Sequence, residues 1–319
     1  MKTTATSKRL KFMNPTRRSF LKSTASLTTG LLMSRLETFA QDQPAFAVPK
    51  DFAVKILATN WGYEGNWEAF CKKAKDAGYD GIEVWLPGKE NDRQEMLDAV
   101  KKYNLQLGFL VGAWQGDFKA HLAAFQKNLD DCVKLQPIYI NCHSGRDYFS
   151  FEQNKQFIDA TLKAAKASGI PIFHETHRSR ICYSAPVTRK FLEEIPEMRL
   201  NVDLSHWCTV HESLLQDQPE TVRLALSRAD HIHARIGHSE GPQVNDPRAP
   251  EWNEVVKQHF AWWDEVAQNK IKAGAKYLTI LTEFGPPNYL PTLPYTRQPV
   301  ANQWEINVYM KELLRKRYS

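Results

Sequence analysis

The sequence predicts an α/β fold of the eight-stranded barrel class, the (β/α)8 or TIM barrel. Beyond Pro49, short apolar runs that are typical of buried strands alternate with amphipathic helical stretches. Their starts lie about thirty residues apart until the last, longer interval, which is the spacing that a barrel of roughly 250 residues requires. The eight runs begin near Val54, Gly81, Gln106, Ile138, Pro171, Leu200, His231 and Tyr277.

An open, doubly wound sheet is the alternative arrangement for alternating strands and helices. We disfavour it because the strand count is eight and no glycine-rich phosphate-binding motif follows the first strand. The helical stretches support the alternation, since each carries an apolar stripe that would face the strands. Two of these stripes are Trp67, Phe70, Cys71, Ala74 and Gly78, and Phe118, Leu122, Phe125, Leu129, Cys132 and Val133.

Residues 1–40 have the pattern of a twin-arginine export signal, and residues 41–319 are expected to form one barrel domain. Thr16-Arg17-Arg18-Ser19-Phe20-Leu21-Lys22 precedes a modest apolar stretch that ends near Met33. Small residues before Gln41 predict cleavage there, and the stretch is too short and too rich in Ser and Thr to span a bilayer. We therefore expect a periplasmic protein without a membrane anchor; the alternative is a basic, disordered tail.

The excess of basic over acidic residues in the whole chain comes from this predicted signal segment. Residues 1–40 hold eight of the 42 Lys and Arg residues and one of the 36 Asp and Glu residues, which leaves 34 basic and 35 acidic side chains. A net charge of −1 gives no electrostatic reason to expect nucleic acid as a partner. A neutral or weakly polar small molecule fits better, and a homo-oligomer remains open.

The five cysteines do not form a metal-binding or disulfide pattern. Cys71, Cys132, Cys142, Cys182 and Cys208 lack any Cys-x-x-Cys spacing, and a disulfide framework is unusual at this length. Cys182 and Cys208 follow neighbouring predicted strands, so a pairing between them in an oxidising compartment stays open.

Four polar residues at the ends of consecutive predicted strands point to one divalent metal ion. Glu175, Asp203, His233 and Glu283 each end a short aliphatic or β-branched run. In a barrel, the carboxyl ends of the strands meet at one mouth, where three carboxylates would repel one another unless a cation neutralised them. Three carboxylates and one imidazole suit Mn²⁺, Co²⁺, Mg²⁺ or Zn²⁺. The alternative is four polar residues that are solvated separately at the bases of loops.

Other polar and aromatic residues at strand ends are candidate substrate contacts. The alternation of a strand places His177 on the same face as Glu175, and Arg235 on the same face as His233. Glu83 and His143 are further polar residues at strand ends, and tryptophan rings there can stack on a sugar or simply cap the core. These tryptophans are Trp61, Trp85, Trp114 and Trp207. The Gly- and Pro-rich segment 237–250 predicts a long ordered loop on the same side.

These motifs resemble the xylose-isomerase-like barrels, a group of sugar isomerases, 3-epimerases and related enzymes that includes endonuclease IV. The resemblance covers residues 41–319 and includes Gly81-Ile82-Glu83, Asp203-Leu204-Ser205-His206 and Glu283-Phe284-Gly285. It implies that Glu175, Asp203, His233 and Glu283 hold the metal and that His206 contacts substrate. One departure is Arg235, which lies two residues after His233, whereas the epimerases carry their substrate-binding arginine several residues further on.

The resemblance implies proton transfer beside a sugar carbonyl through an enediolate, with Glu175 and Glu283 exchanging the proton and a carbohydrate as substrate. His206, Arg235 and His177 would hold hydroxyl groups. Two alternatives stay open. The first is a lyase or hydratase acting on 3-keto-glycosides, which the long loop favours; the second is a periplasmic sugar-binding protein without turnover.

Overall fold

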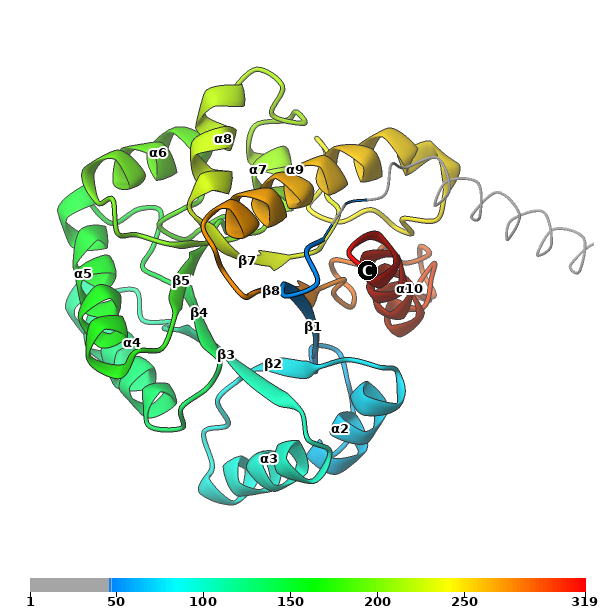
Figure 1. Cartoon of the computed structure of the whole chain (residues 1–319), viewed down its shortest axis with the longest axis horizontal. Helices are drawn as coiled ribbons and strands as arrows, with labels where there is room; N and C mark the ends of the chain where they lie inside the picture. The colour runs from blue at the N-terminus through cyan, green and yellow to red at the C-terminus, as the bar shows by residue number, and fades with distance from the viewer. Residues whose placement is uncertain (1–45, 47) are drawn as a thin grey trace, which may run out of the picture. The chain divides into compact units, whose positions relative to one another are not determined.

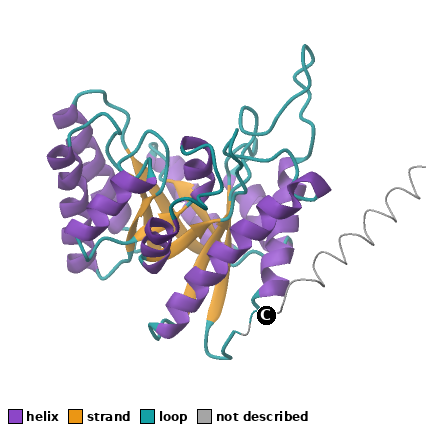
Figure 2. Cartoon of the chain, turned by 90° about the horizontal axis from the view of Figure 1, so that it is seen from above, coloured by secondary structure: helices purple, strands orange, loops and turns teal. Residues whose placement is uncertain are grey.

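The computed structural model describes residue 46 and residues 48–319, and this part of the chain forms the predicted barrel. Eight parallel strands follow one another in chain order around a closed barrel, and the last strand pairs with the first. Figure 1 shows the helices around the outside of the strands, and Figure 2 shows the same arrangement after a 90° turn. The (β/α)8 prediction is confirmed.

The strands are short and the helices longer, as expected for this architecture. The strands are β1 (Ala53–Thr59), β2 (Gly81–Trp85), β3 (Gln106–Gly112), β4 (Tyr139–His143), β5 (Ile172–Glu175), β6 (Leu200–Val202), β7 (Ala229–His233) and β8 (Tyr277–Thr282). The helices are α2 (Trp67–Asp76), α3 (Glu90–Lys102), α4 (Phe118–Val133), α5 (Phe151–Ser168), α6 (Ala185–Glu194), α7 (Leu204–Val210), α8 (Pro219–Ser227), α9 (Asn253–Lys272) and α10 (Gln303–Arg317), with a short 3-10 turn η1 (Pro250–Trp252) before α9.

The predicted strand starts differ little from the observed ones. The largest shift is in β7, which begins at Ala229 rather than His231 because Ala229 pairs with Leu200 of β6. Two helices rather than one separate β6 from β7, and α7 starts directly after Asp203. The predicted twin-arginine signal lies outside the described residues, and within those residues no helix is long and apolar enough to cross a membrane.

The lower interior of the barrel is apolar, and polar side chains occupy the end where the strands finish. Leu57, Tyr139, Phe173 and Leu281 form a buried cluster inside the strands. Gly108 makes room for it, since a Cβ atom on this residue would lie 2.6 Å from the Tyr139 ring.

All five cysteines are free thiols, so Cys182 and Cys208 are not joined.

A buried histidine on α9 holds the loop that follows β7. The His259 side chain bonds the Val255 carbonyl through Nδ1 at 3.0 Å and accepts from the Gly237 amide at Nε2 at 3.3 Å. This arrangement needs the neutral imidazole, because a protonated ring could not accept the amide hydrogen bond. Burial lowers the pKa of His259 from 6.5 to about 4.

We therefore expect acid to destabilise the protein partly through His259. Its pKa is lower in the folded than in the unfolded chain, so the stabilisation is present above pH 6.5 and is lost as the pH falls toward about 4. Between pH 7 and about pH 4.5 the loss should be about 2–3 kcal/mol. Urea unfolding of His259→Gln should show a pH dependence that is weaker by this amount, and an unchanged dependence would contradict the assignment.

Candidate active site

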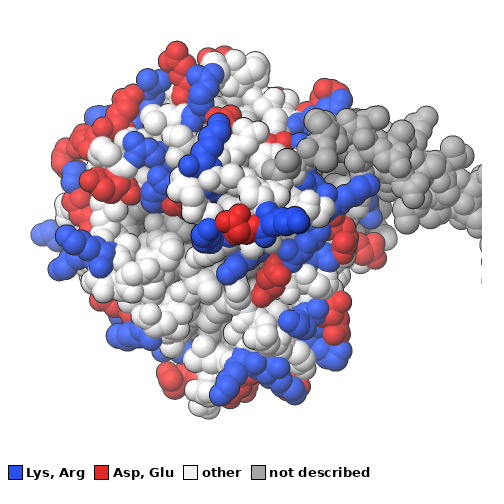
Figure 3. Space-filling model, in the orientation of Figure 1, with Lys and Arg blue, Asp and Glu red and all other residues white. Residues whose placement is uncertain are grey.

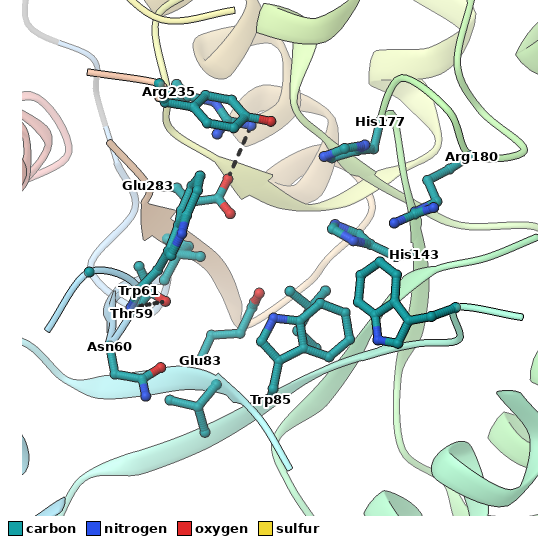
Figure 4. Close-up of a pocket in the computed structure, with 16 residues that line it drawn as sticks. Thr59, Asn60, Trp61, Glu83, Trp85, His143, His177, Arg180, Arg235 and Glu283 are labelled. Atoms are coloured by element: carbon teal, nitrogen blue, oxygen red, sulfur yellow. Dashed lines mark hydrogen bonds and ion pairs between the residues drawn. The ribbon is translucent and has the colours of Figure 1, made fainter. Parts of the chain in front are cut away.

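A cavity of about 490 Å³ opens at the carboxyl ends of the strands. This volume lies in the range of small-molecule sites. Figure 4 shows acidic, basic and aromatic side chains around the same space. The side chains that line it include seven polar and four aromatic ones. These are Asn60, Glu83, His143, His177, Arg180, Arg235 and Glu283, and Trp61, Trp85, Trp114 and Tyr289.

The four candidate metal ligands come together at the base of this mouth. Glu175 ends β5, Asp203 caps the start of α7, His233 ends β7 and Glu283 directly follows β8. One ligand-type atom from each residue lies within 4.8 Å of those of the other three, and all four side chains are buried. His233 Nδ1 is 2.7 Å from a Glu283 oxygen and 3.5 Å from a Glu175 oxygen.

The chemistry of these atoms fits a divalent cation. Within the described residues, Glu175 Oε1 is buried without a hydrogen-bond partner, which is costly unless another group satisfies it. The buried atoms His233 Nδ1 and Glu283 Oε2 lie 2.7 Å apart and pair with each other. Burial lowers the pKa of His233, but Glu283, Glu175 and Glu83 together raise it well above the ordinary value. The carboxylates therefore favour a positive charge at this point, and the donor set of oxygens and one imidazole suits Mn²⁺, Co²⁺, Mg²⁺ or Zn²⁺.

Arg235 lies beside two of these candidate ligands. Its Nη2 contacts Asp203 Oδ2 and His206 Nε2, and it is 3.5 Å from a Glu283 oxygen. Asp203 is fixed on its other side, because Oδ1 accepts from the amide of Ser205 at 3.1 Å. Burial raises the pKa of Asp203 to about 6, against the lowering effect of Arg235. Arg235 thus holds one ligand in place and presents a cation to the cavity next to Glu283.

Glu83 both lines the cavity and supports His233 from behind. Its Oε1 is 3.0 Å from His233 Nε2, and its Oε2 lies 2.7 Å from the Tyr139 hydroxyl and 3.1 Å from His231 Nε2. Burial raises the pKa of Glu83, but His233 and His231 lower it well below its usual range. With a metal ion bound, an ionised Glu83 would hold the proton of His233 on Nε2 and leave the Nδ1 lone pair, on the side of Glu175 and Glu283, for the ion.

Replacing Glu83 with Gln should therefore weaken metal binding. An amide holds the imidazole less firmly than a carboxylate, and the loss of such an outer partner typically reduces affinity by about 10–100-fold. Titration of Mn²⁺ into the purified variant measures this change. Glu197→Gln is the matched control, because Glu197 is exposed and precedes β6 at the opposite end of the barrel. Equal affinities in the two variants would contradict the supporting role.

Three histidines form a row along one side of the site. His143 Nε2 is 3.0 Å from Glu175 Oε2, the rings of His143 and His177 are 4.4 Å apart, and those of His177 and His206 are 3.9 Å apart. Burial lowers the pKa of His177 and of His206 well below the ordinary value, so both rings are neutral near pH 7. His143 and His177 line the cavity, whereas His206 lies behind Arg235 and is fully buried.

The aromatic residues surround the mouth. Trp61 and Trp114 line the cavity, as does Trp85, whose ring is 5.5 Å from that of Trp114. Trp207 instead packs in the core and donates to the Cys182 carbonyl at 2.9 Å. Sequence reasoning did not select Tyr289, which lies 5.0 Å from the Trp61 ring and below the Arg235 guanidinium. The Gly285-Pro286-Pro287 run after Glu283 was the available signal for a loop at this position.

Comparison with known proteins agrees with this fold. Solved structures that resemble the chain include a D-tagatose 3-epimerase-like protein (12% identity, 82% of this chain and 96% of that chain, TM-score 0.55). Two others are 3-keto-D-glucoside 4-epimerase YcjR from E. coli (14% identity) and the probable 3-DHS dehydratase AsbF from Bacillus anthracis (15% identity). In each case the match covers 82% of this chain and 99% of that chain, with a TM-score of 0.52. These identities establish a shared fold alone.

None of the curated protein sequences matches the chain. Residues 71–250, more than half of the sequence, match the family described as the xylose isomerase-like TIM barrel. This match covers β2 to β7 and three of the four candidate metal ligands, with Glu283 beyond its end. The chain therefore belongs to the xylose isomerase-like TIM-barrel family.

Proposed function

We propose that this protein is a divalent-metal-dependent isomerase or epimerase of sugars. The observation that carries the proposal is the convergence of Glu175, Asp203, His233 and Glu283 within 4.8 Å at the base of a cavity with tryptophan walls. Such walls suit the flat C–H faces of a sugar, and the polar groups suit its hydroxyls. The epimerases among the structures with this fold are consistent with the reaction class.

A bound divalent cation would supply Lewis acidity to adjacent oxygens of the substrate. Glu283 lines the cavity, and its carboxylate can take the proton from the carbon beside a carbonyl. The C–H electron pair then forms the carbon–carbon double bond of an enediolate, and the negative charge moves to the carbonyl oxygen. Arg235, next to Glu283, can stabilise that charge, and the neutral His177 can bond a hydroxyl.

The route by which the proton returns decides between the two activities. Delivery by Glu283 to the neighbouring carbon on the same face, together with transfer of the hydroxyl proton from one enediolate oxygen to the other, gives aldose–ketose isomerisation. Epimerisation needs a second group on the opposite face, for which we propose Glu175. Glu175 is 1% exposed and is not part of the cavity wall, but its Oε2 lies 3.0 Å from Nε2 of His143, which lines the cavity.

Hydrogen exchange tests the proposal. Protein loaded with Mn²⁺ or Co²⁺ should introduce deuterium from D₂O at the carbon next to the carbonyl of a cognate sugar, as measured by NMR. A chelator should abolish the exchange. Absence of exchange across a broad panel of aldoses and ketoses would overturn the proposal.

A lyase or hydratase that acts on 3-keto-glycosides is the second candidate. The cavity size and the outward-facing Trp114, which is 62% exposed, leave room for a group beyond one sugar ring. Proton removal would proceed as above, but the enediolate would then expel the aglycone. Release of the aglycone from an oxidised glycoside, without interconversion of sugars, would select this reaction.

We further propose that the partner is a small carbohydrate rather than nucleic acid. On the face that Figure 3 shows, Lys and Arg side chains are interspersed with Asp and Glu, and residues 41–319 carry a net charge of −1.

We also propose export through the twin-arginine signal. Changing Arg17 and Arg18 to Lys should keep the protein in the cytoplasm on cell fractionation, and unchanged export would contradict this assignment.

A further inference from the structure

We infer that Arg180 and Trp114 on the cavity wall, with Arg146 beside Trp114, form a second subsite that binds an anionic group of the substrate. This anion subsite lies at the mouth of the cavity whose base holds the candidate metal ligands. The inference rests on the proposed function and deepens it, because it assigns the substrate to the acidic saccharides.

Arg180 is a buried guanidinium that faces the cavity. The side chain is 4% exposed and lines the cavity wall. Figure 4 shows its guanidinium pointing toward the side where His143 and His177 lie. Its one side-chain hydrogen bond within the described residues is a long contact of 3.5 Å to the Ser179 carbonyl, and its Nε has no partner there. Most of the five N–H donors of Arg180 are therefore available to a ligand.

No carboxylate within residues 48–319 forms an ion pair with Arg180 or with Arg146. The arginines that do form ion pairs there are Arg93, Arg189, Arg199, Arg235, Arg248, Arg315 and Arg317. A buried charge without a counter-ion is costly. Burial, together with the neighbouring Arg146, lowers the pKa of Arg180 to about 10, so the group remains charged near neutral pH.

The ring of Trp114 compensates this charge only in part. The guanidinium of Arg180 lies 5.0 Å from the ring centroid, and that of Arg146 lies 5.9 Å from it. An aromatic face attracts a cation but does not provide in-plane acceptors for the guanidinium N–H groups. Arg146 also makes one long hydrogen bond of 3.5 Å, from Nη2 to the Trp114 carbonyl, and its Nε has no partner within the described residues. Two neighbouring cations therefore keep free donors beside Trp114.

The two loops that carry these arginines are held in position. Asn154 at the start of α5 is buried and donates to the Arg146 carbonyl at 2.8 Å. The amide of Ile181 donates to the Ser144 carbonyl at 3.1 Å, which ties the Arg180 loop to the end of β4. Gly145 has a φ of +53°, and a Cβ atom there would lie 2.3 Å from Asn154 Oδ1. The geometry of the subsite is thus fixed before a ligand binds.

The chemistry of the subsite defines its ligand. Arginine forks bind carboxylates and phosphates through paired hydrogen bonds. Trp114 and Trp85 can stack on the ring that carries the anion. A hexuronate and a sugar phosphate share this chemistry, so both belong in the test.

Calorimetric titration of the purified, metal-loaded protein tests the inference. The probes are D-glucose with D-glucuronate, D-galactose with D-galacturonate, D-glucose 6-phosphate and inorganic phosphate. We expect at least one acidic probe to bind about tenfold or more tightly than its neutral counterpart. In Arg180→Gln this advantage should fall by roughly tenfold to hundredfold, while Arg223→Gln, an exposed arginine on α8, should keep it.

Every result of this titration either supports or overturns the anion subsite. Preference for the uronates or for the phosphates identifies the anion, whereas equal binding of acidic and neutral probes, or no binding of any probe, overturns the subsite. Equal weakening of both classes in Arg180→Gln also overturns it, since that result indicates a packing role. If Arg180→Gln does not fold, Arg180→Lys and Arg146→Gln still report on the preference.

This test is separate from that of the proposed reaction. Metal-dependent proton exchange that occurs only with neutral sugars would retain the proposed function and reject the subsite. Arg180-dependent binding of acidic sugars without any proton exchange would retain the subsite and reject the proposed function.

Discussion

Replacing Glu283 with Gln is expected to reduce turnover by about 10²–10⁴-fold, because an amide cannot accept the substrate proton. Glu283 lines the cavity and is also one of the four candidate metal ligands. The rate of deuterium incorporation into a cognate sugar measures the effect. The thermal midpoint of the metal-free protein should change by only a few degrees, since Gln keeps the size of Glu283 and its amide oxygen can still accept a hydrogen bond from His233 Nδ1.

The matched control for this substitution is Glu197→Gln. It makes the same chemical change on an exposed loop before β6 and should leave the exchange rate unaltered. Metal content should be measured in both variants, because Glu283 is also a proposed ligand. A Glu283→Gln protein that retains its metal and exchanges protons at the wild-type rate would remove Glu283 from the mechanism.

Metal binding is expected to stabilise the folded protein strongly. Glu83, Glu175, Asp203 and Glu283 are buried at one end of the barrel, and bringing such groups together is costly without enough positive charge. A cation present at about 100 times its Kd adds about 2.7 kcal/mol to the free energy of unfolding. For a domain of this size, that corresponds to a rise in Tm of roughly 5–10 °C. Thermal unfolding with Mn²⁺ and with a chelator measures the difference.

The control for this prediction is His233→Ala. The substitution removes one proposed ligand, so the variant should be less stable than the wild type and should gain little from Mn²⁺. An equal gain in Tm for the variant and the wild type would indicate that the stabilising ion binds elsewhere. No gain in either protein would contradict a metal site.

The barrel was predictable because its signals are local and repeat along the chain. Apolar runs at regular intervals, separated by amphipathic helices, define eight strands whatever the details of packing. The convergence of Glu175, Asp203, His233 and Glu283 followed from the same pattern, since parallel strands of a barrel end at one mouth. Their roles as metal ligands remain a proposal.

The neighbours of these residues were not predictable in the same way. Glu83 was expected to bind substrate, but its contacts with His231 and His233 arise because inward side chains from opposite strands meet across the barrel. Sequence spacing gives the face on which a side chain lies, but not which side chains meet across the interior. The close contact between Arg235 and Asp203 depends likewise on side-chain rotamers.

Residues on loops were the hardest to assign. Tyr289, Arg146 and Arg180 reach the cavity region from loops after β8, β4 and β5, and the path of a loop has no periodic signal. Trp207 was expected at the mouth but lies in the core, because α7 begins directly after Asp203 and directs this ring inward. A strand-end position therefore does not by itself place a side chain in the mouth of the barrel.

Anomalous scattering from a crystal soaked with Mn²⁺ tests the central claim most directly. Three clusters of ligand-type atoms lie within the described residues: Glu83, His231 and His233; His143, Glu175 and His177; and Glu175, Asp203, His233 and Glu283. We predict one peak, bound by the four residues of the last cluster. A peak in either of the other clusters, or no peak near Glu283, would contradict the claim.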